Sequence, residues 1–165
     1  MKKWILTLSF LWVLVLSGCW WSSNLVEYSD TFVALVKECT DSTQTLFETF
    51  QAEWTTLDWI SQSLQDCIDI CQNSQKKASD MWDYDKDSSL KDAVVDLLST
   101  EVEYLEKFAA TRQYRNIDDI TDEDRQEYEA VVNDLYQSEE LLNSKFVSLQ
   151  ETQESFAAKH GLNIE

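Results

Sequence analysis

The chain has 165 residues and is strongly acidic, because 31 Asp and Glu face 13 Lys and Arg and give a net charge of −18. Its length suits one domain with a hydrophobic core, while its charge disfavours binding to nucleic acid or to anionic lipid headgroups. Proline is absent and only two glycines occur. This composition argues against sharp hairpins and phosphate-binding loops, and it favours long helices.

The first residues have the form of a secretory signal. Lys2 and Lys3 precede an apolar run that ends at Leu16-Ser17-Gly18-Cys19. The run is shorter than the ~20 apolar residues that span a bilayer, which disfavours an uncleaved membrane helix. Its last four residues match the lipobox of bacterial lipoproteins. The match implies cleavage before Cys19, diacylglycerol on the Cys19 sulfur and acylation of the new N-terminus.

This motif divides the chain and predicts its location. We expect a signal peptide over residues 1–18, a lipidated tether over 19–24 and a helical domain over 25–165. Cleavage removes Lys2 and Lys3, so 11 basic residues would face 31 acidic ones, a net charge of −20. Such a chain needs its acyl chains to stay on a membrane. We expect it in the cell envelope, with the outer membrane or cell surface favoured because Trp20, not Asp, follows Cys19.

Four segments carry apolar residues at spacings of three and four, the pattern of packed helices. They cover about residues 25–50, 56–81, 89–115 and 122–160. Hydroxyl residues precede the last three segments and acidic residues follow in the first turn, as at helix N-caps. Short turns make neighbouring helices antiparallel, so we predict an all-α, up-down-up-down four-helix bundle. The fourth helix is long enough to bend or to run past the bundle.

Two positions disturb these apolar stripes. Ser42 interrupts the first stripe, between Cys39 and Leu46. Glu101 falls within the third stripe. We expect Glu101 to lean aside while its neighbours Leu98 and Val102 pack.

Two stretches resemble a known family. The segment from Asp83 to Ala93, DYDKDSSLKDA, is similar to the turn into the third helix of small bacterial surface lipoproteins. The segment from Phe146 to Gly161 is similar to the closing helix of the same family, which is all-helical and named from leptospiral genomes. The resemblance implies an all-α fold and a surface location. It adds no catalytic residue, because the family has no established activity.

Three cysteines remain beside the lipidated one. Cys67 and Cys71 are one turn apart, and an antiparallel pair of helices places Cys39 opposite them. In an oxidising compartment Cys39 could form a disulfide with Cys67 or with Cys71. The equal alternative is three buried thiols that act as small apolar side chains. A zinc site lacks a fourth ligand, because the only histidine, His160, lies at the far end of another helix.

Asp83, Asp85 and Asp87 alternate as in calcium-binding loops. An EF-hand would have Gly where Ser88 stands and Glu where Val94 stands, so the pattern fails twice. We expect a solvated turn that caps the third helix, with weak cation binding as the alternative. His160 is expected to interact with a helix dipole. We therefore expect no enzymatic activity, no cofactor and no dedicated metal site.

Tryptophan is unusually common and glycine unusually rare, with seven and two residues respectively. Trp20 and Trp21 stand where a flexible tether is usual, and Trp54 and Trp82 stand at expected turns. One hypothesis is that these codons are UGA and are decoded as glycine, as in certain bacterial lineages. The alternative is authentic tryptophan, with some indoles at the membrane interface. The same question concerns the remaining tryptophans, Trp4, Trp12 and Trp59.

Together these patterns predict a lipid-anchored envelope protein with a binding or structural role, and an unidentified envelope protein as its partner. The alternative is a lipoprotein that binds a ligand or cation at its acidic turns or in a cavity between helices.

Overall fold

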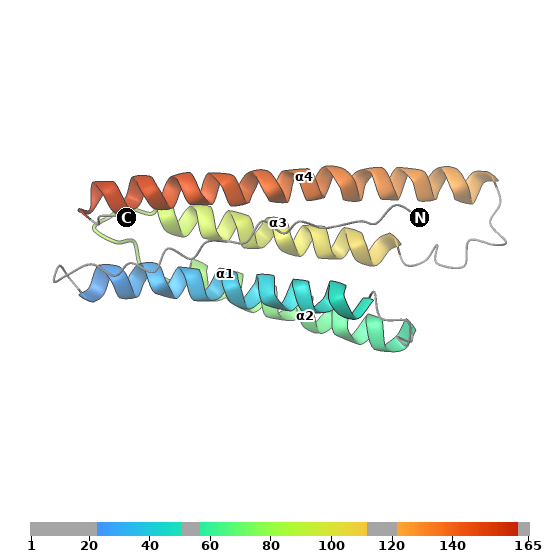
Figure 1. Ribbon diagram of the computed structural model, residues 1–165, viewed down its shortest axis with the longest axis horizontal. Helices are drawn as coiled ribbons and strands as arrows, with labels where there is room; N and C mark the ends of the chain where they lie inside the picture. The colour runs from blue at the N-terminus through green and yellow to red at the C-terminus, as the bar shows by residue number, and fades with distance from the viewer. Residues whose placement is uncertain (1–22, 51–56, 112–121, 162–165) are drawn as a thin grey trace.

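A computed structural model describes residues 23–50, 57–111 and 122–161, apart from the side chains at positions 23, 57–59 and 122–123. Within these ranges the chain forms α1 (Ser23–Phe50), α2 (Leu57–Ser79), α3 (Ser89–Thr111) and α4 (Asp122–Lys159). Figure 1 shows each helix running opposite to the one before it. The prediction of an all-α, up-down-up-down four-helix bundle is therefore confirmed.

Successive helices pack against one another, α1 on α2, α2 on α3 and α3 on α4. The buried apolar residues lie at helical spacings on α1, α2 and α3, where the sequence pattern placed them. Near the start of α1, Tyr28 and Phe32 are buried in the core. In the middle of α3, Leu97 and Leu105 are buried in the same way. At one end, the rings of Tyr28 in α1 and Phe156 in α4 lie 5.9 Å apart. This contact brings the first and last helices together at that end.

The fourth helix is less embedded than the other three. It has 38 residues against 23 in α3, so it is about 20 Å longer and extends past α3 in Figure 1. Leu142, Leu149 and Phe156 are buried in its second half. Tyr128 and Leu135 in its first half are only half-buried. The apolar stripe of α4 therefore extends into the first half of the helix, where the other described residues bury it only in part.

The turn between α2 and α3 is built from local polar contacts. Asp87 Oδ1 accepts a 3.0 Å hydrogen bond from the Ser89 N–H, and Ser88 Oγ donates a 2.6 Å bond to Asp92. These contacts begin α3 at the residue that the sequence predicted. At the other end of the fold, Gly161 has a φ of 76° and closes α4 after Lys159.

The structure bears on the tryptophan question only at Trp82, because the other six side chains lie outside the described residues. Trp82 is 66% exposed, and its ring centroid lies 5.8 Å from that of Tyr28. The left-handed backbone of this turn falls at Asp85 and Lys86, with φ of 49° and 66°. Position 82 itself therefore does not require glycine.

One expectation about the stripes was wrong. Glu101 does not lean aside: it is 1% exposed and points into the core. On α1 the buried hydroxyl is that of Thr43, whereas Ser42 is half-buried. The Thr43 hydroxyl donates a hydrogen bond to one oxygen of the Glu101 carboxyl across the helix interface, which lowers the cost of burying both groups.

Candidate functional site: a buried carboxyl beside a disulfide

The three cysteines of the domain meet in the middle of the α1–α2 interface. Cys39 and Cys71 form a disulfide with their Cα atoms 4.6 Å apart, while Cys67 remains a buried free thiol. The disulfide joins residues 32 positions apart. In the chain-entropy description, closing a loop of that length stabilises the fold by about 4 kcal/mol.

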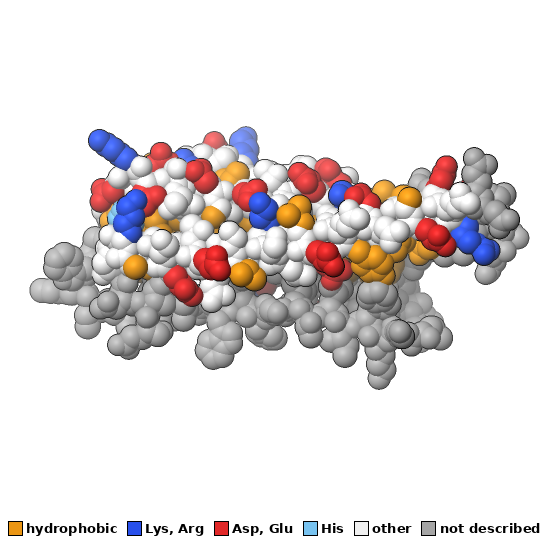
Figure 2. Space-filling view, turned by 90° about the horizontal axis from the view of Figure 1, so that it is seen from above, with side chains coloured by type: hydrophobic (Ala, Val, Ile, Leu, Met, Phe, Trp, Pro, Cys, Tyr) orange, Lys and Arg blue, Asp and Glu red, His pale blue; other side chains and the backbone are white. Residues whose placement is uncertain are grey.

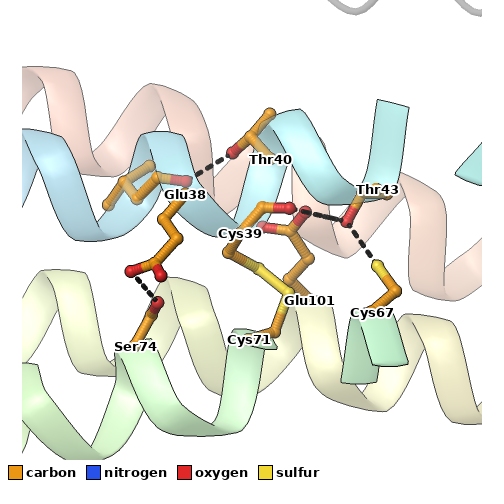
Figure 3. The surroundings of a disulfide bond; sticks show 9 residues. Glu38, Cys39, Thr40, Thr43, Cys67, Cys71, Ser74 and Glu101 are labelled. Atoms are coloured by element: carbon orange, nitrogen blue, oxygen red, sulfur yellow. Dashed lines mark hydrogen bonds between the residues drawn. A yellow bond between two sulfur atoms is a disulfide. The ribbon is translucent and has the colours of Figure 1, made fainter. Parts of the chain in front are cut away.

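Glu101 comes from α3 and reaches this sulfur cluster from below (Figure 3). Its Oε1 accepts a 2.7 Å hydrogen bond from the Thr43 hydroxyl, whose oxygen also lies 3.7 Å from Cys67 Sγ. Its other oxygen, Oε2, is buried and has no hydrogen-bond partner. A carboxyl in this position is incompletely satisfied, which is uncommon in a protein core.

Burial sets the electrostatics of the cluster. Desolvation raises the pKa of Glu101 to about 7, although the Thr43 hydrogen bond works in the opposite direction. Desolvation likewise raises the pKa of the Cys67 thiol, against smaller lowering effects of hydrogen bonds with Ser42 and Thr43. Burial also raises the pKa of Tyr104, with smaller contributions from Glu139 and Glu101. Cys67 is thus a thiol at neutral pH, which makes it a poor nucleophile.

The cluster also holds three atoms that can ligate a metal. The sulfurs of Cys39 and Cys71 and a carboxylate oxygen of Glu101 lie within 4.8 Å of one another. The spacing of the cysteines pointed to both sulfurs, whereas Glu101 was expected to lean toward solvent. Glu101 lies between Leu97 and Leu105 at four-residue spacings, which marks an inward position but does not show what would accept a buried carboxyl there.

The acidic turn is organised differently from a calcium loop. Asp83 pairs with Lys91. Asp87 Oδ2 accepts a 2.7 Å hydrogen bond from Lys159 Nζ and lies 3.1 Å from His160 Nε2. The Lys159 hydrogen bond is the largest of several that hold the pKa of Asp87 well below its usual range. The protein's own cations therefore occupy the Asp83 and Asp87 carboxylates.

These contacts give His160 a structural role that its place at the end of α4 did not indicate. The side chain is 10% exposed and binds Asp87 in the turn between α2 and α3. Its ring also packs on Phe156, with centroids 4.5 Å apart. His160 and Lys159 thus fasten the end of α4 to the start of α3.

The fold and cluster define an acidic all-α bundle with a disulfide and a buried carboxyl at its centre. No protein-family model, curated protein or solved structure matches this chain. The similarity to leptospiral-type surface lipoproteins therefore stays a prediction. The lipobox, residues 16–19, lies outside the described residues. No helix in the described ranges is both long and apolar enough to cross a bilayer.

Proposed function

We propose that this protein is an exported, lipid-anchored helical bundle that binds another protein of the cell envelope and catalyses no reaction. The observation that carries the proposal is the sequence Leu16-Ser17-Gly18-Cys19 close to the start of a folded domain. Helix α1 begins at Ser23, four residues after Cys19. Four residues span at most about 14 Å, so acylation of Cys19 would hold the bundle close to the membrane.

This short tether also suggests an orientation. The start of α1, the turn between α2 and α3 and the end of α4 share one end of the bundle (Figure 1). That end would face the membrane. The long side of α4 would remain open to a partner.

The α4 surface supports a protein partner. Tyr136, Leu141 and Val147 are 37%, 45% and 60% exposed, and acidic side chains are spread along the face seen in Figure 2. A partner with basic side chains around apolar ones would complement this surface. The most unusual groups, Glu101 and Cys67, are 1% exposed, which favours binding over catalysis. Cation binding at the acidic turn has less support because Asp83 and Asp87 already pair with lysines.

Lipid anchoring is tested by Cys19→Ser in the native host. We expect the natural protein to incorporate labelled palmitate and to sediment with membranes, and the variant to lose both properties. Cys67→Ser is the matched control, since it removes a buried thiol and leaves the lipobox intact. A Cys19→Ser protein that still carries the label would contradict the proposal.

Partner binding is tested by placing a photo-crosslinking amino acid at Val147. We expect a discrete crosslinked band in intact cells, and none from the same group at Gln72, an exposed position of α2. Equal crosslinking at both positions, or none at Val147, would argue against α4 as the binding surface.

A further inference from the structure

The middle of the bundle gathers two sulfurs and one carboxyl from three different helices. Cys39 comes from α1, Cys71 from α2 and Glu101 from α3, and each is at most 1% exposed. Their ligand atoms lie within 4.8 Å of one another. In the part of the chain that the structure describes, no other trio of His, Cys, Asp or Glu side chains meets this spacing.

A second, independent observation concerns the free oxygen of Glu101. Oε2 is buried without a hydrogen-bond partner, whereas Oε1 is held by Thr43. A buried polar atom without a partner is costly unless something satisfies it. Figure 3 shows the carboxyl beside Cys39 and the disulfide, and one carboxylate oxygen lies within 4.8 Å of both sulfurs.

We propose that the dithiol form of this protein binds one thiophilic divalent cation, such as Zn²⁺, through Cys39, Cys71 and Glu101. Thiolates and a carboxylate are ordinary zinc ligands, at distances of about 2.3 Å and 2.0–2.2 Å. Glu101 supplies the third protein ligand beside the two cysteines. The Thr43 oxygen, 2.7 Å from Glu101 Oε1, is a further oxygen beside these three ligands. This inference does not rest on lipid anchoring.

The cation and the disulfide compete for the same two sulfurs. A dithiol reductant gives two electrons and two protons to the Cys39–Cys71 disulfide, becomes a disulfide itself and leaves two thiols. The cation then displaces both thiol protons to solvent and binds the thiolates. Oxidised glutathione reverses the process: it takes two electrons from the two thiolates and two protons from solvent, becomes two glutathione thiols and restores the protein disulfide. The cation is then released.

Cys67 lies outside the proposed site. Its sulfur contacts the Thr43 hydroxyl at 3.7 Å but does not belong to the trio of ligand atoms. Only two of the three buried cysteines, Cys39 and Cys71, would therefore bind the cation.

The first test uses Co²⁺ as a spectroscopic substitute for Zn²⁺ on the full chain, reduced with a phosphine in the absence of oxygen. We expect one Co²⁺ per chain, the intense visible bands of a tetrahedral ion and sulfur-to-cobalt charge transfer. Zn²⁺ should displace the Co²⁺, and oxidised glutathione should abolish the spectrum. The weak spectrum of hydrated Co²⁺ from the reduced chain would overturn the proposal.

Variants assign the ligands. Glu101→Gln keeps the side-chain shape without the charge, and we expect it to weaken Co²⁺ binding by at least about tenfold. Its control is Glu103→Gln, which removes an exposed carboxylate from the same helix and should leave affinity unchanged. Cys39→Ser and Cys71→Ser should each lose charge-transfer intensity, while Cys67→Ser should keep the full spectrum. Circular dichroism verifies that each variant is helical.

Two results would contradict the assignment. Natural affinity in a helical Glu101→Gln variant would exclude the carboxylate as a ligand. Loss of the spectrum in a helical Cys67→Ser variant would show that the sulfurs are wrongly assigned.

Discussion

Two buried acids at different places in the bundle have opposite electrostatics. Asp87, at the end of the bundle, is 8% exposed and is bound by Lys159, His160 and the Ser89 N–H. Glu101, in the middle, is 1% exposed and has one neutral hydroxyl as its partner. The pKa of Asp87 is held well below its usual range, whereas that of Glu101 rises to about 7. The difference shows that the partners of a buried acid decide its charge state as much as burial does.

The two regions also serve the fold differently. At the end of the bundle, a charged carboxylate ties α4 to the turn before α3 through polar contacts. In the middle, a covalent bond ties α1 to α2, and Glu101 remains poorly satisfied beside it. The stability of the middle therefore depends on redox state and on pH near neutrality, while that of the end depends on charge at acidic pH.

The largest predicted effect is that of the disulfide. Reduction should lower the free energy of unfolding by about 4 kcal/mol, because it frees a long loop in the unfolded chain. Urea unfolding with and without a phosphine, in the presence of a metal chelator, measures this loss. A double variant with Cys39→Ala and Cys71→Ala should be insensitive to the reductant. Equal unfolding midpoints for the oxidised and reduced natural protein would contradict the prediction.

Next in size is the pH dependence that Glu101 gives to the oxidised protein. Its pKa is about 7 in the fold against an ordinary value of 4.5. The unfolded chain therefore releases this proton at lower pH than the folded protein does. Stability should fall by about 3 kcal/mol between these two values and change no further above pH 7.

The Glu101→Gln variant serves as the comparison. Its stability should not fall with pH through ionisation at position 101, so it should be more stable than the natural protein at pH 8. Glu103→Gln, with its exposed carboxylate, should retain the dependence of the natural protein. Two other groups near Glu101, Cys67 and Tyr104, have raised pKa values and stay neutral in this pH range. Parallel pH profiles for the natural protein and Glu101→Gln would contradict the account.

A smaller effect is expected at the other acid. Asp87→Asn should cost about 1–2 kcal/mol at pH 7, because it weakens hydrogen bonds to Lys159, His160 and the N-terminus of α3. The stabilisation that ionised Asp87 gives to the fold is complete above the ordinary pKa of aspartate. It is lost as the pH falls through the lowered pKa of the folded state. Urea unfolding at pH 7 and pH 3 tests this, and the difference between the two proteins should be smaller at pH 3 than at pH 7.

The smallest effect is predicted for Trp82→Gly. The indole is two-thirds exposed, so the change should alter stability by about 0.5 kcal/mol or less. Thermal unfolding of both proteins measures the difference. A small difference makes glycine at this position compatible with the fold, and the gene then decides between the two residues. UGG codons at all seven tryptophan positions would end the glycine hypothesis.

Much of the fold could be predicted because the spacing of apolar residues indicates where each helix lies. Each observed helix begins within two residues of the predicted segment, and the polar residues before α3 located its first residue. The disulfide could be predicted only as a choice between Cys67 and Cys71. The two differ by a single turn, and only the register of α1 against α2 selects between them.

The carboxyl at the centre could not be predicted, for a different reason. A charged residue within an apolar stripe normally leans to solvent, because burying it is costly. What reduces that cost here is the Thr43 hydroxyl, 58 positions away in the sequence. Likewise the contact between His160 and Asp87 joins residues 73 positions apart. Pairings at this distance depend on the packing of helices, which one sequence does not specify.

The most direct test of the account is an NMR titration of the carboxyl carbon of Glu101 in the oxidised protein. Selective ¹³C labelling of glutamate, with Glu101→Gln to assign the resonance, isolates this group from the exposed glutamates. We predict a midpoint near pH 7 for Glu101, in line with its raised pKa. A midpoint near 4.5, the ordinary value, would show that the carboxyl is solvated, and it would contradict the buried centre described above.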